Sequence, residues 1–103
     1  MTRHLIIFIE PKMNHGNVTS YATSYSYQLV LSTVQKLDPD AIIKRHENSS
    51  YMMDVESEFD FNDLNTSYTY KLPIVIHSID VKIRDVEKDI IIKNFTIKTK
   101  KTK

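Results

Sequence analysis

The sequence predicts an all-β fold, a small antiparallel sandwich or barrel of six to seven strands joined by short turns. Two observations support this prediction. Apolar and polar residues alternate with period two over Tyr51–Phe61 and again from Tyr68 to Ile83, as in strands with one buried face. The 103 residues include only two alanines and one glycine, whereas Ile, Val, Thr and Tyr, which favour strands, are abundant.

We expect one domain, residues 1–97, followed by a short tail, residues 98–103. The domain starts with His4–Ile9, a continuous apolar run typical of a strand buried on both faces, and Pro11 is expected to end it. The tail has four basic residues, no acidic residue and no apolar residue, so we expect it to be flexible.

The segment Thr19–Leu37 fits two patterns. With period two, tyrosines and leucines share one strand face over more positions, and many of its residues are poor helix formers, so a strand is preferred. With period 3.6, Ser20 or Ser24 would be the N-cap, Asp38-Pro39 would end the helix, and an apolar stripe would cover one face (Tyr27, Val30, Leu31, Val34, Leu37). The alternative fold is therefore α+β with one helix near 20–37.

Two strands are expected between this segment and the C-terminal third. Ala41–Lys44 is a short apolar segment between turns. Tyr51–Phe61 alternates strictly, with Met, Asp and Glu between its apolar residues, so one of its faces should be exposed to solvent.

The phase of the alternation changes at His77-Ser78. Up to Ile76 the apolar residues occupy even positions, and from Ile79 onward they occupy odd positions. One extra residue in the strand, a β-bulge, would keep Ile76 and Ile79 on the same buried face. Pro73 cannot donate to a ladder, so we expect it at a sheet edge or at the start of a strand.

The last strand, Ile90–Ile97, carries apolar residues on both faces. Ile91, Phe95 and Ile97 share one face, and Ile90 and Ile92 lie on the other. A single core cannot cover both faces. Ile90, Ile91 and Ile92 are therefore the predicted self-association residues. The predicted class of function is a non-enzymatic interaction or assembly module with a second copy or another protein as partner.

No residue pattern in the chain is typical of catalysis or of a cofactor. The sequence has no cysteine, no G-x-S-x-G motif and no glycine-rich phosphate loop. Its four histidines do not have the spacing of a helix-borne metal site (His4, His15, His46, His77). We therefore expect no enzyme, no catalytic residue, no cofactor and no bound metal.

Single-stranded nucleic acid is the alternative partner. Tyr25 and Tyr27 would stack on bases, and the tail would contact phosphates through Lys98, Lys100, Lys101 and Lys103. A formal net charge of only +1 does not favour this alternative. No apolar run approaches the ~20 residues of a membrane helix, and the N-terminus lacks a secretory pattern, so we expect a cytoplasmic protein without membrane contact.

Overall fold

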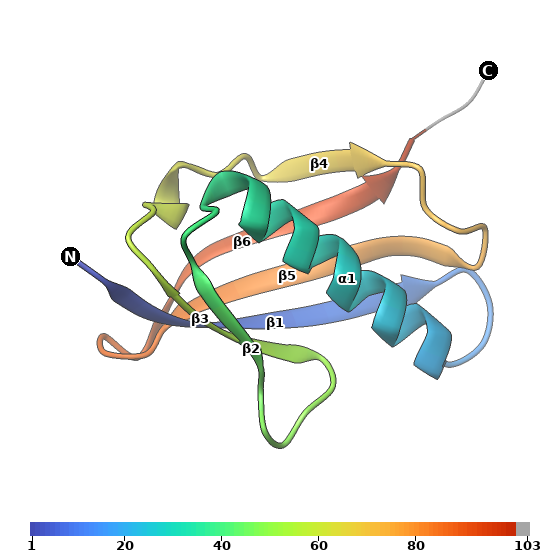
Figure 1. Cartoon of the computed structure of the whole chain (residues 1–103). Coiled ribbons are helices and arrows are strands. Elements are labelled where there is room, and N and C mark those ends of the chain that lie inside the picture. The colour runs from blue at the N-terminus through green and yellow to red at the C-terminus, as the bar shows by residue number, and fades with distance from the viewer. Residues whose placement is uncertain (101–103) are drawn as a thin grey trace.

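A computed structural model describes residues 1–100 and shows one six-stranded sheet with one helix packed on it (Figure 1). The strands are β1 (Arg3–Met13), β2 (Ile42–Arg45), β3 (Met52–Ser57), β4 (Ser67–Tyr70), β5 (Ile76–Asp85) and β6 (Ile90–Thr99). The helix is α1 (Ser20–Leu37), and a short 3-10 turn, η1 (Phe61–Asp63), follows β3.

The strand order in the sheet is β2-β3-β1-β5-β6-β4, with β2 and β4 at the edges. Neighbouring strands are antiparallel except β4 and β6, which are parallel. The fold is broadly β-rich, as predicted. The sheet is not closed into a barrel and no second sheet packs on it within residues 1–100, so the architecture is two-layer α+β.

The segment from Thr19 to Leu37 is a helix, so the preferred prediction of a strand was wrong and the alternative is confirmed. Its N-cap is Thr19, not Ser20 or Ser24, and the Thr19 hydroxyl accepts a hydrogen bond from the Ala22 N–H at 3.1 Å. The helix ends at Asp38, whose N–H donates to the Val34 carbonyl. These capping interactions and the burial of one face outweigh weak intrinsic helix propensities.

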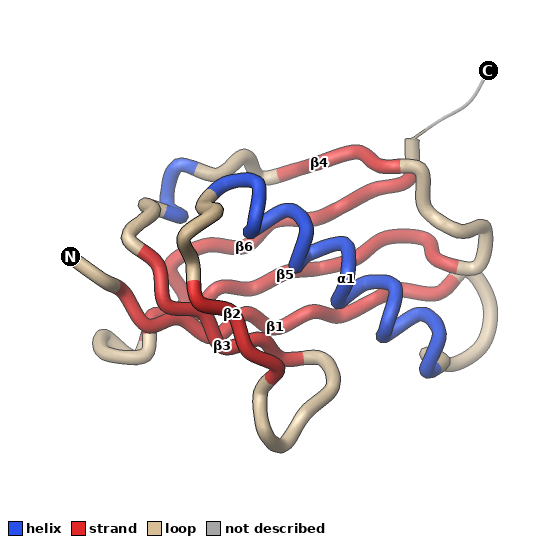
Figure 2. The backbone as a smooth tube through the Cα atoms, in the orientation of Figure 1, coloured by secondary structure: helices blue, strands red, loops and turns tan. Residues whose placement is uncertain are grey.

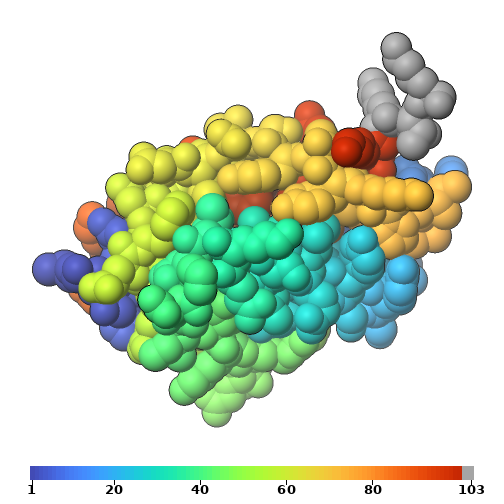
Figure 3. All heavy atoms as spheres, turned by 45° about the horizontal axis from the view of Figure 1, so that its top comes forward, coloured from blue at the N-terminus to red at the C-terminus, as the bar shows by residue number. Residues whose placement is uncertain are grey.

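Helix α1 crosses the sheet obliquely and covers one of its faces (Figure 2). Alternate residues of the strands point towards it and form the core, among them Ile7 and Ile9 of β1, Ile79, Val81 and Ile83 of β5, and Ile97 of β6. In the space-filling view, α1 lies beside β4 and the connection from β4 to β5 (Figure 3). This core contains every fully buried large side chain of residues 1–100, including Phe61 of η1.

The predicted bulge at His77-Ser78 is confirmed. Ile76 pairs with Met13 and Ser78 with Lys12, which leaves His77 as the extra residue of β5. Ile76 and Ile79 are both buried. Pro73 lies in the connection between β4 and β5, so the prediction of a sheet edge or a strand start was wrong, and the alternation around it does not belong to a single strand.

Strand β1 continues beyond Pro11 to Met13, so the prediction that Pro11 ends it was wrong. The Ile9 N–H donates to the Tyr51 carbonyl on the β3 side. Backbone groups of alternate residues point the same way, so the Pro11 nitrogen also faces the β3 side. Strand β3 begins at Met52, opposite Phe8, and therefore leaves that side of β1 unpaired at Pro11, where no N–H is needed.

The Ser26 hydroxyl lies between α1 and the sheet, fully buried, and makes no hydrogen bond with any described residue. An unsatisfied buried hydroxyl costs ~1–3 kcal/mol. Ser26→Ala should therefore raise the free energy of unfolding. Ser24→Ala, on the exposed side of the same helix, is the control because it reports only the better helix propensity of alanine.

We expect chemical denaturation to show a gain for Ser26→Ala that exceeds the gain for Ser24→Ala by ~1 kcal/mol. A Ser26→Ala variant less stable than the wild type would mean that the hydroxyl has a partner in solution.

Candidate interaction surface

The face of the sheet opposite α1 is covered by no helix or strand among residues 1–100 (Figure 1). We call this side the open face. On β1 the even-numbered residues point there, because the odd-numbered residues form the core with α1. Two of them, Ile6 and Phe8, are apolar and only partly exposed. They form a short apolar stripe along the centre of the sheet.

The register of the strands shows what lies beside this stripe. Ile6 pairs with Asp54 of β3 on one side and with Arg84 of β5 on the other. Phe8 pairs with Met52 of β3 and with Lys82 of β5. Adjacent strands of a sheet lie ~4.8 Å apart, so the side chains of paired residues on the same face are direct neighbours.

The two flanks of the stripe carry opposite charge. On β3 the open face shows Asp54 and Glu56 beside Ile6 and His4, and on β5 it shows Lys82 and Arg84 beside Phe8 and Ile6, with Asp80 further along beside Glu10. In the row of Ile6 the open face is therefore ordered as acidic, apolar and basic across β3, β1 and β5, and Lys44 of β2 lies on the outer side of Asp54.

Histidines accompany the acidic flank. His46 Nδ1 lies 2.8 Å from Asp54 Oδ1, and His4 Nδ1 lies 3.3 Å from Glu56 Oε1. On the basic flank, Arg84 forms an ion pair with Asp89 of the turn before β6. All of these groups are partly exposed, and pairs of this kind contribute ~0–1 kcal/mol each. Such weak contacts leave both flanks able to exchange their partners for groups on another molecule.

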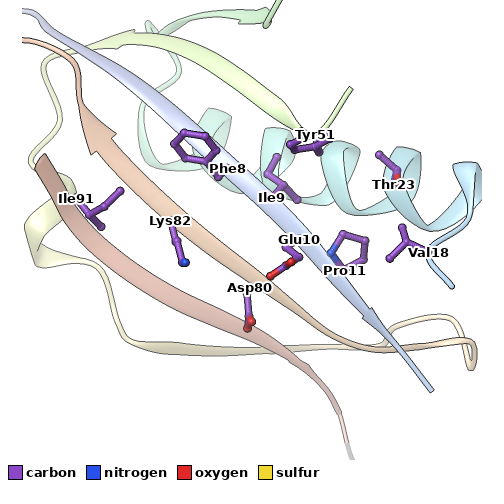
Figure 4. Close-up of a pocket in the computed structure, with 10 residues that line it drawn as sticks. All are labelled: Phe8, Ile9, Glu10, Pro11, Val18, Thr23, Tyr51, Asp80, Lys82 and Ile91. Atoms are coloured by element: carbon purple, nitrogen blue, oxygen red, sulfur yellow. The ribbon is translucent and has the colours of Figure 1, made fainter. Parts of the chain in front are cut away.

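The open face is hollowed next to the stripe (Figure 4). The hollow has a volume of about 730 Å³ and continues around the unpaired edge of β1. Phe8, Lys82 and Ile91 lie on its open-face side, and Tyr51 and Val18 lie on its edge side. A predominantly apolar hollow with a few charged groups suits contact with another molecule.

The three isoleucines predicted for self-association occupy different environments. Ile91 pairs with Arg84, is 45% exposed and belongs to the open face. Ile90 is 53% exposed at the turn, and Ile92 is partly buried against the core. The register shift between Ile83 and Arg84 makes Ile92 the extra residue of a second bulge.

This second bulge explains apolar residues on both sides of β6. It places Ile91 on the face opposite Phe95, which pairs with the core residue Val81. The prediction that Ile91 and Phe95 share a face was therefore wrong.

The residues predicted for nucleic-acid binding are not brought together. Tyr27 is 4% exposed, with the Arg45 guanidinium 4.0 Å from the centre of its ring, so it offers no free face for stacking. Burial raises the pKa of the Tyr27 phenol, Arg45 lowers it in part, and Asp54 raises it further. Tyr25 is partly buried, and its hydroxyl donates to the Lys71 carbonyl at 3.4 Å.

The predicted lysines are at the end of β6 and beyond. Lys98 and Lys100 are exposed there, and Lys101 and Lys103 lie outside the described residues. The expectation of several tyrosines on one strand face was wrong, because a helix distributes side chains at these spacings around its axis.

Ile6 and Phe8 were missed as surface residues, because a continuous apolar run also fits a strand buried on both faces. A signal for one exposed face was present further along the same strand. Glu10 and Lys12 are even-numbered like Ile6 and Phe8, so they share a strand face with them.

In residues 1–100, no group of three or more His, Asp or Glu side chains is placed to hold a metal ion. The same part of the chain has no helix with the length and apolar character required to cross a membrane. Comparison of the chain with protein-family models, curated proteins and solved structures finds no match.

Proposed function

We propose that this protein is a non-enzymatic interaction module that self-associates through the open face of its sheet. The observation that carries the proposal is the apolar stripe of Ile6 and Phe8, continued by Met52 and Ile91, on a face that no described element covers. An exposed apolar patch framed by charged residues is typical of a protein–protein contact.

The energetics allow such a contact to be moderately strong. Complete burial of a large apolar side chain contributes ~1.5–3 kcal/mol, and association costs ~4–15 kcal/mol. Ile6, Phe8 and Met52 are already partly covered by their neighbours, so each gains less than the full amount. We therefore expect a micromolar rather than a nanomolar dimer, with a binding free energy near ~ −8 kcal/mol.

The test is the solution mass as a function of concentration, from about 1 μM to about 1 mM, which spans binding free energies of ~ −8 to −4 kcal/mol. The wild-type mass should already lie above 12.1 kDa at about 1 μM and rise towards twice that value at about 1 mM. Ile91→Lys should stay at the monomer mass and remain folded, because Ile91 is already 45% exposed.

Ile74→Lys is the matched control, because Ile74 is 89% exposed in the connection between β4 and β5, outside the open face. It should dimerise like the wild type. A wild-type mass that stays at 12.1 kDa over the whole range would refute the proposal.

Binding of single-stranded nucleic acid stays the alternative prediction. It is supported only by the exposed Lys98 and Lys100 near the end of β6, and the acidic flank of the open face would repel phosphate. The same mass measurement with a labelled oligonucleotide at low salt separates the two proposals. A complex that weakens steeply with salt would favour nucleic acid over self-association.

A further inference from the structure

The charge order of the open face is complementary to itself. We infer that two copies pack open face to open face, related by a two-fold axis that runs roughly along β1. This inference rests on the self-association proposed above and specifies its geometry. A rotation about such an axis keeps β1 over β1 and places the β3 flank of one copy over the β5 flank of the other.

The contacts follow from the register. Ile6 would meet Ile6 and Phe8 would meet Phe8 along the axis. Asp54 of each copy would meet Arg84 of the other, because both are paired with Ile6 and lie on opposite sides of it. The dimer therefore has two equivalent carboxylate–guanidinium contacts beside an apolar centre, and Arg can bind a carboxylate through two parallel hydrogen bonds.

Other two-fold axes in the same plane fit worse. An axis perpendicular to the strands between Ile6 and Phe8 would place Arg84 over Lys82 of the second copy, so like charges would meet. An axis between Phe8 and Glu10 would place each phenyl ring on a carboxylate. The axis along β1 places Ile6 on Ile6, Phe8 on Phe8 and Asp54 on Arg84. Further along the same axis it also places Glu10 on Glu10, which is the unfavourable contact of this arrangement.

The area of the open face is sufficient. Five strands ~4.8 Å apart and four rows of side chains ~6.8 Å apart cover roughly 600 Å². A standard protein–protein interface buries ~800 Å² on each partner, so this one is at the small end of the range. Two sheets stacked in this way lie ~10 Å apart with their strands within about 30° of each other, which is the packing of an aligned β-sandwich.

The inference makes a specific prediction about charge reversal. Asp54→Arg alone brings two arginines together at each contact, and Arg84→Asp alone brings two aspartates together. Each single variant should dimerise at least tenfold more weakly than the wild type. An equimolar mixture of the two variants should restore dimers, because every contact in the mixed dimer again joins an arginine to an aspartate. The double variant, Asp54→Arg with Arg84→Asp, should dimerise by itself.

Matched controls carry the same charge changes elsewhere. The controls are Asp40→Arg and Lys36→Asp. Lys36 lies on α1 and Asp40 follows it, so both residues are exposed outside the open face. These controls should dimerise like the wild type. Restoration in the mixture also shows that both single variants are folded, since only folded chains can form the mixed dimer.

Sedimentation of each variant and of the mixture distinguishes the outcomes. Weak single variants with a restored mixture support the axis along β1. Weak single variants without restoration in the mixture overturn that axis, and single variants as strong as the wild type show that Asp54 and Arg84 do not meet. A monomeric wild type overturns both the inference and the proposed function. If the wild type is dimeric but the mixture is not restored, or the single variants are as strong as the wild type, only the inferred axis fails and the proposed function stands.

Discussion

Deleting Asp80 should unfold the protein, whereas deleting His77 from the same strand should leave it folded. His77 is the extra residue of the bulge between Ile76 and Ser78. Without it, Ile76 and Ile79 are two positions apart, so a regular strand still places both on the buried face. We therefore expect the deletion of His77 to change the free energy of unfolding by only about 1 kcal/mol.

The deletion of Asp80 acts on the regular part of β5. It shifts the alternation by one residue, so Val81 and Ile83 turn to the open face while Lys82 and Arg84 turn to the core. Exposing two buried apolar residues costs ~1.5–3 kcal/mol each, and burying two charges costs several kcal/mol more. The total cost is comparable to the whole free energy of unfolding of a typical domain, ~5–15 kcal/mol.

Circular dichroism and thermal melting of the two deletion variants check this prediction. Two variants with equal melting temperatures would show that the register of β5 is not set by its buried face.

Gln28→Pro should lower the free energy of unfolding by about 3 kcal/mol or more. Gln28 is exposed in the middle of α1, so this change disturbs no core contact. Proline removes the hydrogen bond from the N–H of residue 28 to the carbonyl four residues earlier, and its ring clashes with that carbonyl.

Gln28→Ala is the control, and chemical denaturation should show a change within about 0.5 kcal/mol, because both residues are good helix formers. Equal stability of the proline and alanine variants would contradict a helix over Ser20–Leu37. That result would instead support a strand over this segment, as its alternating pattern favours.

The surface proposed for self-association was only partly accessible from the sequence. Ile91 was predicted as a contact residue, and the structure places it on the open face next to Arg84. The opposed flanks could not be predicted, because Asp54 and Arg84 are neighbours of Ile6 only through the pairing of three strands that are distant in sequence. Pairing between distant segments depends on the topology of the sheet, which no local pattern specifies.

Most of the strands and their local irregularities could be predicted from the sequence alone. Alternation with period two is a local property, so it located the exposed and buried sides of β3 and the bulge at His77. A separate local signal, the Asp38-Pro39 pair, predicted the end of the uncertain segment, and α1 does end at Leu37 with Asp38 as its C-cap.

Two features depend on long-range packing and could not be predicted: Thr19–Leu37 is a helix, and one face of the sheet stays open. More residues of this segment match the period-two pattern of a strand than the period of a helix. The helix, however, buries Ala22, Val30 and Val34 against β1 and the other strands. That burial depends on residues distant in sequence and outweighs weak local propensities. Since one helix covers only one side of a six-stranded sheet, Ile6 and Phe8 stay partly exposed on the opposite side.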